Sequence, residues 1–172
     1  MTKQELEVCI KTYGRDIYSF CRQLTCDRQE ADELYQDTLL TAVERMESID
    51  SENNPKSYLL SIAIRHWQNR KRKFAWRRRI ADIRPMAEDQ SGDQAVEGET
   101  SPEEKVLGRE KDAAVRQAVN RLPERLRIVT LLYYMEELST GQIAAALKIP
   151  KGTVSSRLHQ ARELLRQELE DF

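Results

Sequence analysis

Residues 82–104 interrupt a sequence whose periodicity is otherwise helical. They contain almost no large apolar residue, and every charged residue among them except Arg84 is acidic. Such a composition cannot bury enough surface to offset the chain entropy that folding removes. The 172-residue chain is therefore expected to form two small helical domains, residues 1–80 and 105–172, joined by an acidic flexible linker over residues 81–104.

Apolar residues recur at steps of three and four on both sides of this linker, which is the pattern of amphipathic helices. One stripe spans residues 6–24, a second spans residues 31–46, and a third helix is expected to start at Asn54-Pro55. No segment alternates with the period of a β-strand, so the predicted fold class is all-α. The stripes place three further apolar residues on buried faces: Val43, Val115 and Met135.

The C-terminal part carries a helix-turn-helix pattern. Ser139 can cap a short helix, residues 148–152 form a brief break, and Thr153 is expected to cap a longer helix. The outward face of the second helix offers side chains that reach phosphates and base edges: Lys151, Thr153, Ser155, Ser156, Arg157, His159, Gln160 and Arg162. An ordinary αα-hairpin with a solvated face is the alternative. DNA binding is favoured because this face is basic as far as Arg162 and turns acidic only beyond it.

Residues 65–79 contain eight basic residues and no acidic one. Two tryptophans, Trp67 and Trp76, lie among them. Because cations hold a phosphate backbone and aromatic rings stack on unpaired bases, the block predicts a contact with nucleic acid. For either tryptophan alone, packing in the core is the favoured interpretation.

The composition gives no sign of catalysis, metal binding or membrane insertion. No Gly-rich phosphate loop, nucleophile–base pair or cluster of metal ligands occurs, so neither an enzyme nor a cofactor is expected. No run of about 18 apolar residues exists, and the start of the chain has no apolar signal region. The three cysteines, Cys9, Cys21 and Cys26, are odd in number and form no CxxC motif, which predicts reduced thiols in a cytoplasmic protein.

Both parts of the chain carry motifs of one known family. In the N-terminal part the motifs are residues 32–42, which begin Asp32-Glu33-Leu34-Tyr35-Gln36-Asp37, and residues 57–63, which precede the basic block. In the C-terminal part they are Leu122-Pro123-Glu124-Arg125, Gln142-Ile143-Ala144, Gly152-Thr153-Val154 and Ser156-Arg157-Leu158-His159. On these residues the chain resembles bacterial sigma factors of the extracytoplasmic-function class over nearly its whole length.

That resemblance implies contacts with core RNA polymerase and with promoter DNA. The chain would bind the β′ clamp and the β flap of the polymerase, and the residues implied at the clamp are Asp32, Glu33, Gln36 and Asp37. The third helix would hold the melted strand of the −10 element through Arg65, Trp67, Asn69, Arg70, Arg72 and Lys73. The helix-turn-helix would read the −35 element with the eight outward residues named above.

The resemblance also implies an inhibitory partner and a role for the linker. Anti-sigma factors, often anchored in a membrane, mask the surfaces with which family members bind polymerase and DNA. The acidic linker would thread the polymerase channel as a mimic of nucleic acid, and a plain solvated tether is the alternative.

Two other classes of function stay open on the sequence. One is a stand-alone helix-turn-helix transcriptional regulator, which is disfavoured because no separate dimerisation helix is visible. The other is an RNA-binding adaptor that uses residues 65–79, which would leave the helix-turn-helix without a role.

Overall fold

The computed structural model describes residues 1–81 and 106–170, and every regular element in these ranges is helical. The all-α fold class is thereby confirmed for this part of the chain. The predicted linker lies outside the described residues, apart from Ala81 at the end of a helix. In chain order the elements are α1 (Lys3–Thr25), α2 (Arg28–Glu44), the 3₁₀ turn η1 (Met46–Ser48), α3 (Pro55–Ala81), α4 (Val106–Arg121), α5 (Glu124–Thr130), the π-helical turn η2 (Leu131–Met135), α6 (Thr140–Leu147) and α7 (Lys151–Glu170).

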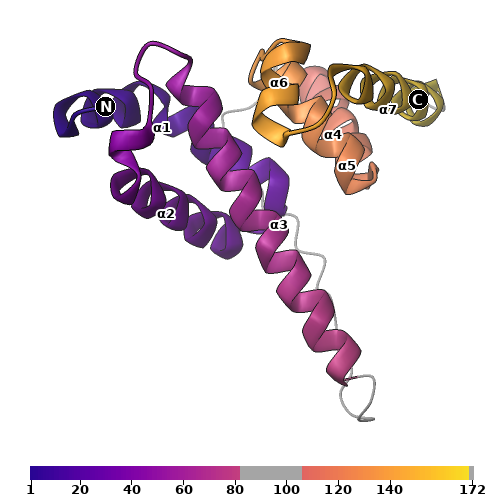
Figure 1. The fold of residues 1–172 in the computed structure, drawn as a ribbon. Helices are drawn as coiled ribbons and strands as arrows, with labels where there is room; N and C mark the ends of the chain where they lie inside the picture. Colours follow the sequence, from indigo (N-terminus) through magenta and orange to yellow (C-terminus); the bar gives the residue numbers. More distant parts are fainter. Residues whose placement is uncertain (82–105, 171–172) are drawn as a thin grey trace.

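The first three helices form an N-terminal group in which each contacts the other two (Figure 1). Their boundaries follow the local sequence, because polar side chains satisfy the free N–H groups of the first turns. Asp27 accepts from the Glu30 N–H at 2.8 Å, and Asn54 accepts from the Ser57 N–H at 3.2 Å just before Pro55 opens α3. Fully buried side chains fill the space between the three helices: Ile17, Phe20, Leu24, Leu34, Leu59 and Leu60.

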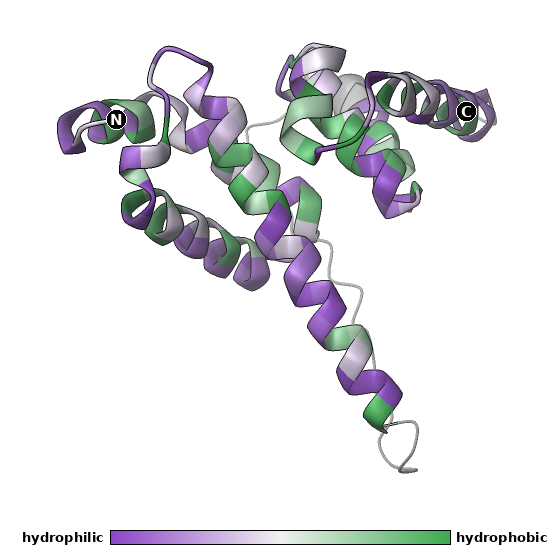
Figure 2. Ribbon diagram, in the orientation of Figure 1, coloured by the Kyte–Doolittle hydropathy of each residue, from purple (hydrophilic) through white to green (hydrophobic). Residues whose placement is uncertain are grey.

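Helix α3 extends well beyond the core that its first half helps to build (Figure 1). Its apolar residues as far as Trp67 are mostly buried, whereas every residue from Lys71 to Ala81 is exposed. Figure 2 shows the change as a largely hydrophilic outer half that carries isolated hydrophobic residues. Beyond Trp67, therefore, α3 contributes no buried side chain to the core of the described residues.

Helices α4 to α7 form a C-terminal group that contains the helix-turn-helix. Ser139 caps α6 as expected, in a capping box with Gln142. Lys148 ends α6 in the left-handed conformation, with φ 55°. The expected Thr153 cap is wrong, because α7 already starts at Lys151 and the Thr153 N–H donates to the Pro150 carbonyl at 3.0 Å. The Val154 N–H also donates to the Pro150 carbonyl, at 3.2 Å, so Pro150 rather than Thr153 stands at the start of the helix.

The two groups pack against each other through one continuous hydrophobic core, chiefly where α6 lies on α3. A buried ion pair crosses this contact: Lys56 Nζ lies 2.8 Å from Glu136 Oε2 and 3.2 Å from Asp16 Oδ2. The Glu136 side chain is only 1% exposed. Arg127 also reaches across and donates to the Leu24 carbonyl at 3.0 Å. The two predicted domains are therefore in direct contact, a relationship that the sequence did not predict.

Three residues that the periodicity placed on buried faces are exposed: Val43, Val115 and Met135. Val43 lies on α2, where apolar side chains occur on more than one face, so the stripe alone did not distinguish the side that packs. Met135 lies in the π-helical turn, whose wider winding shifts its side chain out of the α-helical register.

Candidate nucleic-acid and protein interfaces

The second helix of the helix-turn-helix, α7, holds all eight residues predicted to contact duplex DNA. Its buried side is formed by Val154, Leu158 and Ala161, which pack on the rest of the C-terminal group. Because these positions recur at helical spacing, the polar residues between them face outward. Six of the eight predicted residues are exposed and two, Thr153 and Arg157, are half-buried.

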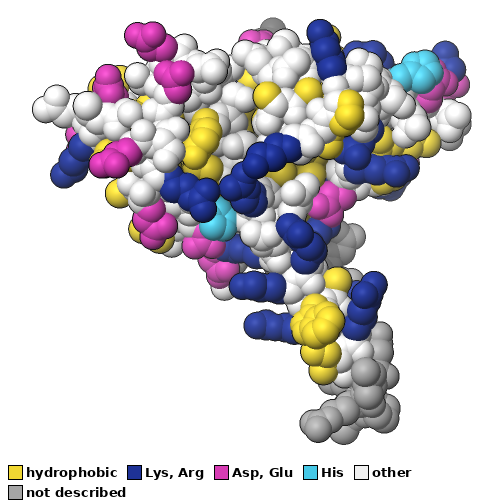
Figure 3. All heavy atoms as spheres, viewed as in Figure 1, with side chains coloured by type: hydrophobic (Ala, Val, Ile, Leu, Met, Phe, Trp, Pro, Cys, Tyr) yellow, Lys and Arg dark blue, Asp and Glu magenta, His cyan; other side chains and the backbone are white. Residues whose placement is uncertain are grey.

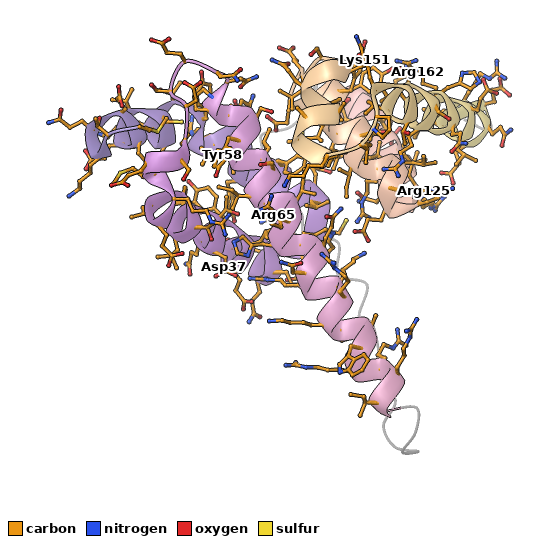
Figure 4. The ribbon with its side chains drawn as sticks, in the orientation of Figure 1. Asp37, Tyr58, Arg65, Arg125, Lys151 and Arg162 are labelled. Carbon is orange, nitrogen blue, oxygen red and sulfur yellow. The ribbon has the colours of Figure 1, made fainter. Side chains whose placement is uncertain are left out.

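A hollow beside the start of α7 combines two arginines with the helix N-terminus. It is lined by Arg125 of α5 together with Gly152, Thr153, Ser156, Arg157 and Gln160. The first N–H groups of a helix and nearby guanidinium groups both favour an anion such as a phosphate. Sequence reasoning missed Arg125 as a site residue, although it belongs to the Leu122–Arg125 motif. Figure 4 labels Arg125 on α5, and Lys151 and Arg162 on α7.

Arg162 is held in place by two tyrosines of the π-helical turn. Its Nε donates to the Tyr134 hydroxyl at 2.6 Å, and its guanidinium lies 5.7 Å from the ring centroids of both Tyr133 and Tyr134. The hydrogen bond to Tyr134 raises the pKa of Arg162 above its usual value. The side chain therefore presents a fixed positive charge at the surface.

The predicted strand-binding residues of α3 fall into two environments. Arg65, Asn69, Arg72 and Lys73 are exposed. Trp67 is only 7% exposed and belongs to the core, with the Lys71 ammonium 4.9 Å from its ring centroid. The structure thus bears out the packing interpretation for Trp67. For Trp76 that interpretation is wrong, because the side chain is 64% exposed. Figure 3 shows Lys and Arg side chains along the projecting part of α3, with hydrophobic side chains among them.

Arg70 is oriented by carboxylates of the neighbouring helix. Its guanidinium lies 2.5 Å from Asp37 Oδ2 and 3.6 Å from Glu33 Oε2, both on α2. The structure therefore brings together residues that the resemblance assigned to different partners. Beside them, His66 of α3 lies 2.7 Å from the Thr41 hydroxyl, which adds a second polar contact between the two helices.

The exposed side of α2 is partly acidic and partly apolar. Glu33 and Gln36 are exposed, while Asp32 is half-buried and accepts from the Tyr18 hydroxyl. Next to Gln36 and Asp37, Leu40 is 62% exposed and Val43 is 53% exposed. Sequence reasoning missed these two residues as surface positions. Leu40 and Val43 follow Gln36 at i+4 and i+7, a spacing that places all three residues on one face of the helix. This spacing could have identified them from the sequence.

The three cysteines differ in their exposure. Cys9 and Cys21 are buried, and burial raises the pKa of the Cys21 thiol to about 12. Cys26 is exposed. Residues 1–81 and 106–170 hold no cluster of His, Cys, Asp and Glu suited to a metal ion, and no helix there is long and apolar enough to cross a bilayer.

Comparisons with known proteins match both halves of the chain. The Sigma-70 region 2 family model matches residues 9–78, and the Sigma-70, region 4 model matches residues 112–165. The RNA polymerase sigma-H factor of Pseudomonas aeruginosa is 31% identical over 171 residues, which cover 98% of this chain and 88% of that protein. The ECF RNA polymerase sigma factor SigW of Bacillus subtilis is 29% identical over 167 residues, which cover 95% of this chain and 88% of the relative.

Two solved structures share the fold. The sigma factor RpoE of Bartonella quintana, solved in complex with the anti-sigma factor NepR, superposes with a TM-score of 0.70 at 24% identity and covers 98% of this chain and 96% of that one. CnrH, solved in complex with the cytosolic domain of CnrY, gives a TM-score of 0.67 at 16% identity, with coverage of 99% and 90%.

Proposed function

Because the chain belongs to the extracytoplasmic-function class of bacterial sigma factors, which direct RNA polymerase to promoters, we propose that its two helical groups divide this task between polymerase docking and DNA recognition. Matches to both sigma regions favour this family over a stand-alone regulator or an RNA-binding adaptor. Sigma factors act as initiation factors without catalysis of their own, and we propose the same for this chain, in the cytoplasm.

The outward face of α7 is proposed to read the −35 element. The helix enters the major groove with Ser155, Ser156, His159 and Gln160 toward the base edges. Arg157 and Arg125, at the hollow beside the helix start, bind the phosphate backbone. Arg162 supplies a further cation whose orientation Tyr134 fixes, so little side-chain freedom is lost on binding.

The exposed side of α3 is proposed to hold the melted strand of the −10 element. Arg65, Asn69, Arg72 and Lys73 provide cationic and hydrogen-bonding groups along one helix. Arg72 donates to Asn69 Oδ1 at 2.8 Å, so these two side chains act as a pair on the surface. Unpaired strands bind such surfaces through their phosphates, with affinity that falls as the salt concentration rises.

The exposed side of α2 is proposed to dock on the β′ clamp. Glu33, Gln36 and Asp37 suit a basic partner, and Leu40 and Val43 add apolar area that is lost from water on docking. The C-terminal group is proposed to bind the β flap. An anti-sigma factor is proposed as the inhibitory partner, because the similar sigma factor RpoE was solved in complex with the anti-sigma factor NepR.

The observation that carries the proposal is the presence of both sigma regions in one chain, each with its exposed binding face. The test is run-off transcription on fragmented genomic DNA with purified core polymerase. The full chain should bind core and give discrete new start sites. Failure to bind core while the chain alone retains duplex DNA would overturn the proposal.

Two variants separate the roles of the two groups. Arg157→Ala should weaken binding of the holoenzyme to the −35 element without weakening the binding of core. Gln36→Ala combined with Asp37→Ala should weaken core binding and leave duplex recognition by the assembled holoenzyme unchanged. Equal loss of both activities in both variants would contradict the assignment.

A further inference from the structure

The outer end of α3, residues 71–81, has no buried side chain and carries large apolar side chains on its surface. At 1.5 Å per residue these eleven residues extend about 16 Å from the core. Phe74, Trp76 and Ile80 are all more than half exposed. An exposed indole ring offers a large, flat contact area to a partner at little cost in conformational entropy, so Trp76 is a candidate contact residue.

The charge of this end is entirely positive. Residues 71–81 contain six basic residues and no acidic one: Lys71, Arg72, Lys73, Arg77, Arg78 and Arg79. Some of these cations have partners within the described chain, since Lys71 lies 2.7 Å from Glu124 and Arg78 lies 5.8 Å from the Phe74 ring centroid. Arg72, Lys73 and Arg79 form no ion pair with the described residues.

Trp76 lies at the centre of these available cations. Positions 72, 73, 79 and 80 are one turn from position 76 and share its side of the helix. Phe74 is two residues away, on nearly the opposite side, where Arg78 covers its ring. In the part of the chain that the structure describes, no cationic or aromatic side chain covers the Trp76 ring.

We propose that Trp76 is a stacking platform for an unpaired base of the opened promoter, with Arg72, Lys73 and Arg79 on the phosphates beside that base. The inference rests on the proposed function and extends it, since Trp76 is about 10 Å along α3 from Asn69. If the partner of this end of α3 were an acidic protein surface, the cations alone would be enough to bind it, and the aromatic ring would have no role. A flat aromatic ring flanked by cations fits a strand that carries both phosphates and exposed base faces.

The first test compares holoenzyme binding to two forms of one promoter fragment obtained in the run-off experiment, one duplex and one with a premelted bubble. Trp76→Ala should lower affinity for the bubble by roughly 5- to 140-fold, the range for loss of one stacked base. Trp76→Phe should keep most of the affinity, because a phenyl ring still stacks. Ile80→Ala, which removes an exposed apolar side chain one turn away, is the matched control and should bind like the parent chain.

The second test uses the fluorescence of the full chain alone, which has two tryptophans. A single-stranded oligonucleotide should quench the exposed Trp76, and this quenching should disappear in Trp76→Ala while the emission of buried Trp67 persists. Trp76→Ala could instead weaken the binding of core polymerase while the assembled holoenzyme keeps its full affinity for the bubble. That result would show that the Trp76 ring packs on a protein surface of the polymerase, and it would overturn the proposal. Equal effects of Trp76→Ala and Ile80→Ala would overturn it too. The parent chain could fail to initiate transcription while an oligonucleotide still quenches its fluorescence in a way that depends on Trp76. In that case the proposed function would be wrong, and the stacking of a base on Trp76 would still be supported.

Discussion

Arg70 of α3 and Asp37 of α2 neutralise each other, with Arg70 Nη2 donating to Asp37 Oδ2 at 2.5 Å. The family resemblance assigns Arg70 to the DNA strand and Asp37 to the polymerase. In the free chain each of these side chains therefore neutralises the charge of the other. Asp37→Asn should therefore lower core affinity while raising the affinity of the free chain for a single-stranded oligonucleotide by up to about fivefold, the range of a partly exposed ion pair. Binding titrations with core and with the oligonucleotide check this, and Arg70→Ala should shift the oligonucleotide affinity in the opposite direction. A fall in both affinities in Asp37→Asn would show that the pair only holds the two helices together.

Lys56 and Glu136 should contribute strongly to the contact between the two groups. Burial raises the pKa of Glu136, and without Lys56 its carboxylate would have no strong counter-charge. Lys56→Met is expected to reduce the free energy of unfolding by about 3–5 kcal/mol, the effect of breaking a buried pair. Lys56→Met combined with Glu136→Leu should recover most of that loss, because no charge remains buried. Urea unfolding of both variants measures this difference, and a double variant no more stable than the single one would contradict it.

Arg125 is expected to bind phosphate rather than to select bases. Arg125→Ala should weaken the holoenzyme on every promoter by a similar factor, and the slope of log affinity against log salt concentration should become shallower by about one. Arg166→Ala is a suitable control, because Arg166 is an exposed arginine further along α7 that pairs with Glu163 at 2.9 Å. A change in the preferred −35 sequence in Arg125→Ala would instead assign Arg125 to base readout.

Leu40 should contribute to core binding without contributing to folding. Because its side chain is exposed, Leu40→Ala is expected to change the free energy of unfolding by less than about 0.5 kcal/mol. Affinity for core should fall about tenfold, as for an apolar side chain covered in an interface. Val8→Ala removes an equally exposed residue from α1 and should leave core affinity unchanged. Equal core affinities of the two variants would remove Leu40 from the docking face.

The thiols should differ sharply in reactivity. At pH 8 an alkylating reagent should label exposed Cys26 in the folded chain and spare Cys21, whose pKa burial raises to about 12, because the thiolate is the reactive form. The same shift predicts that stability is retained below the pKa of the unfolded thiol and is lost as the pH rises from about 9 toward 12. Mass spectrometry of labelled protein and urea unfolding at several alkaline pH values test both points. Cys21→Ala should show a weaker loss of stability over this range.

Local features were predictable from the sequence. The caps at Asn54 and Ser139 follow from side chains that satisfy free N–H groups, and the buried stripe from Leu6 to Leu24 follows from its spacing. The helix-turn-helix was visible for the same reason, since its outward face is the complement of Val154, Leu158 and Ala161.

Relations between distant residues were not predictable in this way. The general tendency of tryptophan to be buried favoured the core for both Trp67 and Trp76, correctly for the first and wrongly for the second. That tendency carries no information on where α3 leaves its neighbours. The pairs Asp37–Arg70 and Lys56–Glu136 join residues 33 and 80 positions apart, and they depend on how whole helices pack. Exposed Leu40 and Val43 were missed because α2 carries apolar side chains on two faces, and only the packed structure shows which face stays open.

If α3 and α7 read the −10 and −35 elements as proposed, the contact of α6 with α3 opposes promoter binding. Elements centred at −10 and −35 are separated by 25 base pairs, or about 85 Å of duplex at 3.4 Å per pair. The two proposed reading faces lie on helices that share one packed core. For the chain to engage both elements at that separation, the two halves would have to come apart. Apparent promoter affinity is then the intrinsic affinity multiplied by the fraction of open chains. Under the proposed function, a chain whose halves hold each other more tightly would need more polymerase to reach the same promoter occupancy. The strength of the contact between α3 and α6 would then set a threshold for transcription.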